Sequence, residues 1–197
     1  MKILFLTNNL DVTYPLYNYL QRKFYTILLK DKINLDLLKK LNPSIIVSYN
    51  YKHIIKKDII DIYKNKIINL HISYLPWNRG CYPNVWSFIE NTPKGVTIHL
   101  IDEGIDTGDI LFQREVYIDE SLHTLKSSYM LLQKEIQKLF IENLDSTLNF
   151  KFDPKPQNKN EGSYHSFEDF KKYIKPIIDR YGWNIKIKDF LKLVKYP

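Results

Sequence analysis

The chain has 197 residues, of which 44% are hydrophobic, 14% aromatic and 26% charged, a composition typical of a globular domain and not of a disordered segment. No apolar run approaches the roughly 18 residues of a membrane span, and the N-terminus lacks the features of a signal peptide. The formal net charge of +7 suits an anionic small molecule, but the basic residues are mostly scattered singly, which argues against nucleic-acid binding.

The first 71 residues alternate between short apolar runs and segments whose apolar residues have helical spacing. In the first of these segments, Pro15 suits the first turn of a helix. Strands that alternate with helices of about ten residues are typical of βαβ units and a parallel sheet. We expect strands at 2–7, 25–29, 44–49 and 66–71, and helices at 14–24, 33–41 and 56–66.

The pattern changes after residue 90. Two longer apolar runs, 94–102 and 109–118, flank a turn-rich hexapeptide and predict a hairpin-like pair of strands. Residues 124–149 have apolar side chains at three- and four-residue steps, which predicts a long helix. We therefore expect a single Rossmann-like α/β domain with a mixed, mostly parallel sheet, in which residues 1–150 form the main domain and residues 151–197 a linker and C-terminal appendage, packed on the core or at a dimer contact.

Polar residues at the end of one predicted strand are the first candidates for chemistry. Asn69 and His71 are two residues apart, so their side chains project from the same face at the edge where open α/β sheets bind ligands. Asp106 lies in an acidic, glycine-containing turn at the end of a later strand. An amide, an imidazole and a carboxylate together suit acyl transfer. The residues alone favour a structural alternative, in which Asn69 satisfies loop main chain and His71 is a core histidine.

Other site chemistries have less support. The chain has no G-x-S-x-G, G-x-G-x-x-G or Walker A motif, and its five histidines lack metal-ligand spacing, so no metal site is expected. His99 alternates with apolar residues on its strand, which favours a structural role, and Trp86 is expected to anchor the core. Cys81 is the single cysteine, which excludes an internal disulfide and fits a reducing cytoplasm; no role is assigned to it.

Two stretches taken together resemble the folate-dependent formyltransferase family. They are "NLHISYLPWNRGCYPNVW" at 69–86 and "GVTIHLIDEGIDTGDILFQREV" at 95–116. The family pattern is Asn-x-His-x-Ser-x-Leu-Pro, then a strand G-V-T-x-H, then D-x-G-x-D-x-G and a strand containing glutamine. The variant "LPWNRGxxPNxW" and the C-terminal "GSYHSFEDFKKY" most resemble the short sugar N-formyltransferases, which act on nucleotide-linked amino sugars.

The resemblance implies both a reaction and its residues. Asn69, His71 and Asp106 match the catalytic Asn, His and Asp of the family. The implied reaction transfers a formyl group from 10-formyltetrahydrofolate to the amine of a dTDP- or UDP-linked deoxyamino sugar. The folate would bind, largely through main-chain groups, at Ser48, Tyr49, Asn50, Tyr51, Ile54, Asp102 and Gly104. The candidates for the sugar pocket are Trp77, Arg79 and Tyr82, although the residues alone favour packing equally for Trp77 and Tyr82.

Alternatives remain within and outside this family. A glycinamide ribonucleotide formyltransferase carries a glycine-rich phosphate loop after the first strand, where this chain has Asn8-Asn9-Leu10-Asp11. A methionyl-tRNA formyltransferase carries a further C-terminal barrel, for which we expect no room here. A catalytically silent folate- or nucleotide-binding module is the alternative of a different class. The amphipathic "YHSFEDF" segment leads us to expect a homodimer, which sedimentation at micromolar concentration would test.

Overall fold

The computed structural model describes residues 1–158 and 160–196. No helix within these residues is long and apolar enough to cross a membrane. The chain divides into two compact units. The first comprises Met1–His71, Ile98–Phe112 and Phe140–Pro156, and the second comprises Ile72–Thr97, Gln113–Leu139 and Gln157–Pro197. This division does not follow the expected boundary after residue 150, which stays a prediction.

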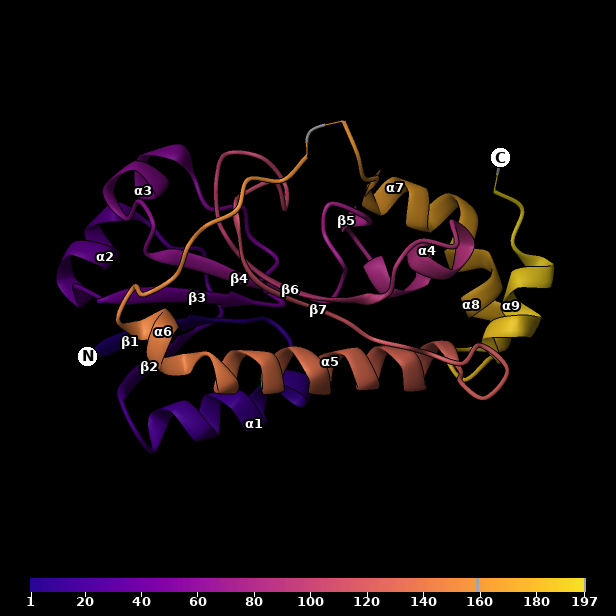
Figure 1. The fold of residues 1–197 in the computed structure, drawn as a ribbon, viewed down its shortest axis with the longest axis horizontal. Helices are drawn as coiled ribbons and strands as arrows, with labels where there is room; N and C mark the ends of the chain where they lie inside the picture. The colour runs from indigo at the N-terminus through magenta and orange to yellow at the C-terminus, as the bar shows by residue number, and fades with distance from the viewer. Residues whose placement is uncertain (159, 197) are drawn as a thin grey trace. The chain divides into compact units, whose positions relative to one another are not determined.

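A six-stranded sheet in the order β2-β1-β3-β4-β6-β7 organises the first unit (Figure 1). The pairs β1–β2, β1–β3 and β3–β4 are parallel. The strands β6 and β7 are antiparallel, since Leu100 N donates to Asp109 O at 2.9 Å and Val116 N donates to Lys94 O at 2.8 Å. The strand β6 is also antiparallel to β4, since Ile101 N donates to Ile67 O at 3.0 Å and Asn69 lies opposite His99. The α/β class with a mixed, mostly parallel sheet is thus confirmed. The strands are β1 Lys2–Leu6, β2 Tyr25–Leu29, β3 Ile45–Tyr49, β4 Ile67–His71, β6 Gly95–Leu100 and β7 Ile110–Glu115.

Helices cover both faces of this sheet within the first unit. On one face, Leu4 and Leu6 of β1 pack in one apolar cluster with Leu38 of α2 and Ile59 of α3. On the other, the ring of Phe5 contacts a side chain of α1. Figure 1 shows α2 and α3 on one side of the strands and α1 on the other. Burial on both faces explains why these strands are continuous apolar runs. The helices are α1 Leu10–Gln21, α2 Leu35–Leu41, α3 Lys57–Ile62 and α6 Leu144–Leu148.

The start of α1 corrects one expectation. The helix begins at Leu10, so Pro15 lies inside it and not in its first turn. The Asn9 carbonyl accepts the main-chain N–H of Thr13, at 3.1 Å, and the Thr13 hydroxyl, at 2.8 Å, so the first turn closes before Pro15. At its interior position Pro15 has no N–H to donate, and the helix lacks one hydrogen bond of its ladder there.

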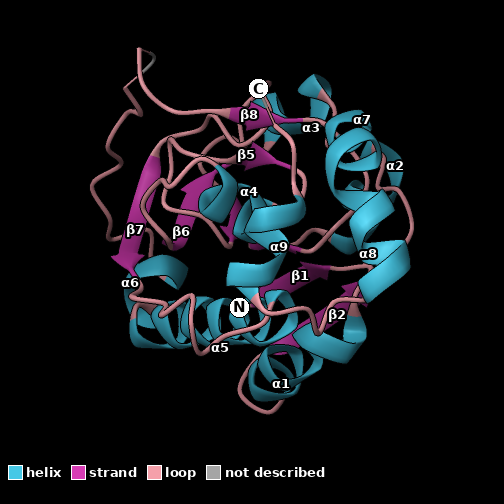
Figure 2. Cartoon of the chain, turned by 90° about the vertical axis from the view of Figure 1, so that its right-hand side faces the viewer, coloured by secondary structure: helices cyan, strands magenta, loops and turns pink. Residues whose placement is uncertain are grey.

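The second unit contains most of the C-terminal segment. A short parallel sheet joins β5 to β8, and Figure 2 shows these two strands beside one another. Trp86 on α4 is fully buried, which confirms it as a core anchor. The long helix predicted at 124–149 is two helices, because the first ends at Glu142 and α6 begins at Leu144. The elements are β5 Arg79–Gly80, α4 Pro83–Ile89, α5 Leu125–Glu142 (which ends in the first unit), β8 Tyr164–His165, α7 Phe167–Asp169, the π-helix η1 Phe170–Ile174, α8 Lys175–Tyr181 and α9 Ile187–Leu193.

Truncating the core beneath the sheet tests this arrangement. Leu38 is fully buried, so Leu38→Ala leaves a cavity and is expected to lower the free energy of unfolding by about 2–5 kcal/mol. Leu122 is 70% exposed, and Leu122→Ala is expected to change the free energy of unfolding by about 0.5 kcal/mol or less. Urea unfolding followed by circular dichroism measures both. Equal losses in the two variants would contradict the assigned core.

Candidate active site

The candidate site begins at the carboxyl end of β4. Asn69 and His71 alternate with apolar residues of this strand, so both side chains lie on one face. In the parallel neighbour β3, Ser48 is in register with Asn69. On the other side of β4, the antiparallel strand β6 brings His99 to Asn69. Side chains from β4 and β6 are therefore in contact at the carboxyl end of β4, the position predicted from the sequence.

Four polar side chains form one cluster, which we call the Asn69 cluster: Asn69, His71, His99 and Asp106. Asn69 Nδ2 donates to Asp106 Oδ1 at 3.1 Å and lies 3.2 Å from His99 Nε2. Asp106 Oδ2 lies 3.6 Å from His71 Nδ1, and Asp106 Oδ1 lies 3.4 Å from His99 Nε2. The side chains of the two histidines and of Asp106 are 2–13% exposed, so the charge of the carboxylate is only weakly screened by water.

His99 also belongs to this cluster, although the pattern of residues along its own strand did not predict a contact with Asn69. Its Nδ1 lies 2.7 Å from the carbonyl oxygen of Leu100, and a carbonyl can only accept, so Nδ1 carries a proton. In the neutral ring, Nε2 is then an acceptor for the Asn69 amide. The expectation of a purely structural role rested on alternation along one strand. The contact between His99 and Asn69 depends on the register of β4 and β6, which the sequence of one strand does not contain. Because Ile67 lies opposite Ile101 in these antiparallel strands, Asn69 lies opposite His99.

Asp106 is held in place by the turn that carries it. The Asp102 carboxylate accepts hydrogen bonds from Gly104 N at 3.1 Å and from the Thr107 hydroxyl at 2.7 Å. These two bonds fold the 102–107 turn around Asp102, and Asp106 itself has a φ of 54°. The predicted ligand-binding residues Asp102 and Gly104 therefore shape the turn that presents Asp106.

Close packing fixes both ends of the same turn. A Cβ atom at Gly108 would lie 1.9 Å from the carbonyl oxygen of Leu100, so only glycine fits there. An ion pair joins Glu103 of the turn to Lys57 at the start of α3. The partners of this pair are each about 60% exposed, and such pairs contribute little to stability. The tight approach at Gly108 is the stronger constraint.

Two of the predicted folate-binding residues end β3. Ser48 is buried and in register with Asn69, so it lies next to the Asn69 cluster along the sheet. The ring of Tyr49 is fully buried, edge-on to Phe5 with 6.4 Å between the ring centroids. The Tyr49 side chain is thus part of the core and does not face a ligand.

The other three predicted folate-binding residues lie in the loop after β3. Asn50 has a φ of 53°, and its carbonyl accepts from Asn8 N at 3.0 Å. The Tyr51 hydroxyl donates to Asp31 O at 2.7 Å, and burial raises the pKa of this hydroxyl. Ile54, in contrast, is 69% exposed. Tyr51 therefore supports the loop, whereas Ile54 presents an apolar surface to solvent.

The three predicted sugar-binding residues belong to the second unit. Trp77 and Arg79 are half-buried, and Arg79 Nε donates to Ser163 O at 3.5 Å. The Tyr82 ring stacks on Phe170 with 3.7 Å between centroids, and burial raises the pKa of the Tyr82 hydroxyl. These three residues occur in one short loop, which we call the 77–82 loop. It is held by residues from the C-terminal segment.

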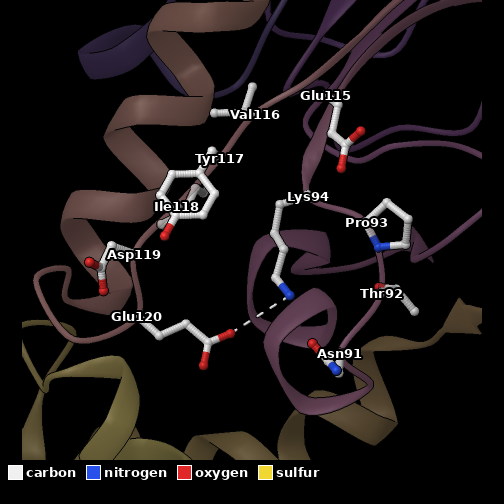
Figure 3. A pocket seen from close by; sticks show the side chains of 10 residues that line it. All are labelled: Asn91, Thr92, Pro93, Lys94, Glu115, Val116, Tyr117, Ile118, Asp119 and Glu120. Atoms are coloured by element: carbon white, nitrogen blue, oxygen red, sulfur yellow. Dashed lines mark ion pairs between the residues drawn. The ribbon is translucent and has the colours of Figure 1, made fainter.

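A separate hollow of about 840 Å³ lies between the segments 91–94 and 115–120 of the second unit (Figure 3). Lys94 points into it, with Nζ 3.7 Å from Glu120 Oε1 and 5.4 Å from the centroid of the Phe88 ring. The charge of Lys94 is thus already compensated. Within the described residues no group of three histidine, cysteine or acidic side chains could hold a metal ion. The Asn69 cluster is the better candidate for chemistry.

The arrangement supplies the parts that acyl transfer to an amine requires. Asn69 offers N–H donors for a developing oxyanion, and Asp106 offers a carboxylate that can accept a proton. The two imidazoles lie on either side of that carboxylate, with 6.2 Å between their ring centroids. Comparison with known proteins points the same way.

A family model described as formyl transferase matches residues 12–144. Curated methionyl-tRNA formyltransferases from Finegoldia magna and Thermodesulfovibrio yellowstonii are 36% and 34% identical to this chain. These alignments cover 68% and 86% of this chain but 44% and 53% of the relatives. The chain therefore spans about half the length of these relatives.

Solved structures match over more of their length. The formyltransferase PseJ from Anoxybacillus kamchatkensis, in complex with UDP-4,6-dideoxy-4-formamido-L-AltNAc and tetrahydrofolate, is 40% identical, with a TM-score of 0.85 and 97% of each chain covered. A 4-N formyltransferase from Francisella tularensis is 28% identical, with a TM-score of 0.72, covering 87% of this chain and 78% of that one. With the family model matching two thirds of its residues, the chain belongs to the formyl transferase family.

Proposed function

We propose that this protein transfers a formyl group from 10-formyltetrahydrofolate to the amine of a nucleotide-linked deoxyamino sugar. The observation that carries the proposal is the Asn69 cluster, in which an amide, two imidazoles and a carboxylate lie close together at the end of β4. The similarity to PseJ along 97% of both chains supports a sugar substrate. Because that complex contains a UDP-linked 4-formamido sugar, a UDP-linked 4-amino-4,6-dideoxy sugar is the first substrate to test.

The loops of the first unit fit a folate. Ile54 and Ile105 lie on the two loops predicted to bind the pterin, and their side chains are 69% and 44% exposed. Exposed apolar side chains on both loops suit a flat ring that would remove them from water. The main-chain groups of the 102–106 turn would provide polar contacts to the same ring. Bound folate would supply the formyl carbon, and the protein would position that carbon and handle the proton.

Asn69 would stabilise the oxygen on which negative charge develops. Its two amide N–H groups already have acceptors, because Nδ2 is within hydrogen-bond distance of both Asp106 Oδ1 and His99 Nε2. The sequence suggests that Asn69 and His71, both fixed on a strand, could donate to the oxyanion with little reorganisation. In this geometry, one N–H of Asn69 must first leave its acceptor. Protonation of Asp106 would weaken the bond to its carboxylate and so release an N–H as the oxyanion forms.

Asp106 and His71 would handle the proton that the attacking amine loses. Asp106 Oδ2 and His71 Nδ1 are 3.6 Å apart, which is too long for a hydrogen bond but close enough for a strong electrostatic interaction. An imidazolium at His71 would thus lie beside a poorly solvated carboxylate. The pair can accept one proton from the amine. The bond between the formyl carbon and the folate nitrogen then breaks, and that nitrogen takes up one proton, so that tetrahydrofolate leaves as a neutral amine.

Removing any of these groups tests the catalytic assignment. Asn69→Ala, His71→Ala and Asp106→Asn are each expected to lower kcat by on the order of 100- to 1,000-fold, because each removes an oxyanion donor or an acid–base group. Binding of both substrates, measured by calorimetry, should change little. The exposed residue Asp153 gives a matched control, and Asp153→Asn should keep wild-type kcat. A near-normal kcat for His71→Ala would contradict the catalytic assignment of His71 and would indicate that this histidine is structural.

His99 is expected to act through Asn69. His99→Ala removes the acceptor that lies 3.2 Å from Asn69 Nδ2, and we expect kcat to fall by about 10- to 100-fold. In the double variant Asn69→Ala/His99→Ala, the two losses should combine to less than their product, with a coupling energy of about 1–2 kcal/mol. Steady-state kinetics on the four proteins of this cycle measure the coupling. Fully multiplicative losses would show that the two residues act independently.

The substrate is tested with purified protein, 10-formyltetrahydrofolate and a panel of dTDP- and UDP-linked amino sugars. We expect formylation of at least one UDP-linked 4-amino sugar, detected by mass spectrometry. Methionyl-tRNA is included because the curated relatives act as methionyl-tRNA formyltransferases. Formyl-methionyl-tRNA without any formylated sugar would establish that second function instead. Tight folate binding with no product from either substrate class would indicate a catalytically silent binding module.

A further inference from the structure

A second buried polar network lies in the second unit, around a carboxylate that the proposed mechanism does not use. Glu90 follows α4, and its side chain is 19% exposed. Glu90 Oε2 accepts hydrogen bonds from the Ser163 hydroxyl at 2.7 Å and from Asn78 Nδ2 at 3.0 Å. Glu90 Oε1 lies 3.0 Å from His165 Nε2, without the alignment of a hydrogen bond. One carboxylate therefore joins three side chains that are distant in the sequence.

The partners of Glu90 are themselves buried and oriented. Asn78 is fully buried, and its Oδ1 accepts from the Thr92 hydroxyl at 2.8 Å. The His165 ring is stacked on Trp86, with 3.9 Å between centroids and 7° between planes. Buried polar groups of this kind are costly to leave without partners. The network therefore fixes the positions of Asn78 and His165 relative to α4.

Main-chain contacts extend this attachment to the 77–82 loop. Arg79 N donates to Ser163 O and Cys81 N donates to His165 O, each at 2.9 Å. A Cβ atom at Gly80 would lie 2.3 Å from His165 O. Of the side chains that Glu90 holds, Ser163 and His165 thus belong to the segment that pairs with the loop, and Asn78 belongs to the loop itself.

The predicted sugar-binding residues of the loop are Trp77, Arg79 and Tyr82, and the anchored positions are 78 to 81. Arg79 is thus anchored through its own main chain, and Trp77 and Tyr82 are each a chain neighbour of an anchored position. A shift of Asn78 or of the segment 163–165 would move all three side chains together.

We propose that Glu90 is a positioning residue for the amino-sugar substrate: it sets the geometry of the 77–82 loop through Asn78, Ser163 and His165 without touching the sugar. This inference rests on the proposed function, in which that loop selects the sugar. It assigns Ser163 and His165, far along the chain, to substrate selection through the same carboxylate.

Glu90→Ala tests the proposal in the full-length protein. Loss of the carboxylate leaves two hydrogen-bond donors without their acceptor, and KM for the sugar nucleotide should rise about 10- to 100-fold, as expected for one hydrogen bond to a charged group. The value of kcat should change by less than about threefold, and folate affinity should not change. Glu90→Gln keeps an oxygen that can accept from Asn78 and Ser163, so it should recover a KM within about threefold of wild type.

Glu115 is exposed, and Glu115→Ala serves as the matched control, with wild-type KM expected. Should Glu90→Ala fail to fold, Ser163→Ala removes one donor to the same carboxylate and should raise KM about 3- to 10-fold. An unchanged KM in the folded variant would overturn the proposal. A parallel loss of folate affinity and kcat would also overturn it, because it would indicate general destabilisation.

Hydrogen exchange separates this inference from the proposed function. In Glu90→Ala, the amides of Arg79 and Cys81 should exchange at least about tenfold faster, while the amides of β1 and β3 keep wild-type exchange. If the wild-type protein formylates no amino sugar, the proposed function fails, but this measurement still tests the anchor. Unchanged exchange at Arg79 and Cys81 would overturn the positioning role whatever the substrate is.

Discussion

The hydrogen bond from Asn69 to Asp106, 3.1 Å long, joins the two parts of the chain on which the proposed chemistry depends. One partner is fixed on a central strand and the other on a turn, so the bond determines where the carboxylate lies relative to both histidines. The environment makes this bond important. With Asp106 only 13% exposed, water replaces a lost donor poorly, and a change in the charge of Asp106 alters the electrostatic energy of its neighbours in the cluster.

The sequence was sufficient for the sheet and for most of the cluster. Continuous apolar runs with helical segments between them predict buried parallel strands, and β1 to β4 lie where they are expected. The two-residue spacing of Asn69 and His71 places both on one face. One error concerns the start of α1. Pro15 favours a first turn on its own, but the helix begins at Leu10 and contains Pro15 in its interior.

His99 could not be identified from its own strand, because a histidine between buried apolar residues has the same local pattern whether it packs or interacts with a catalytic group. Its contact with Asn69 depends on the register of β4 and β6, which are separated by the whole of the 72–94 segment. The short β5–β8 sheet is another such case. Strands of two residues are too short to show an alternation of apolar and polar residues. The pairing of β5 with β8 depends instead on the close approach of the main chain at Gly80 to the main chain at His165.

On the proposed function, chemistry and selectivity are encoded differently in this chain. The reaction type would follow from the residue types at the end of one strand and on one turn, and those residues occur in the two motifs that resemble the formyltransferase family. Selection of the sugar, on the proposed function, follows from the geometry of the 77–82 loop. That geometry depends on Glu90 and on a segment more than 80 positions further along, as the hydrogen bond between Asn78 N and the Ser163 hydroxyl illustrates. Two proteins could thus share the catalytic motifs and the loop sequence and still bind different amines, if the residues beneath the loop differed.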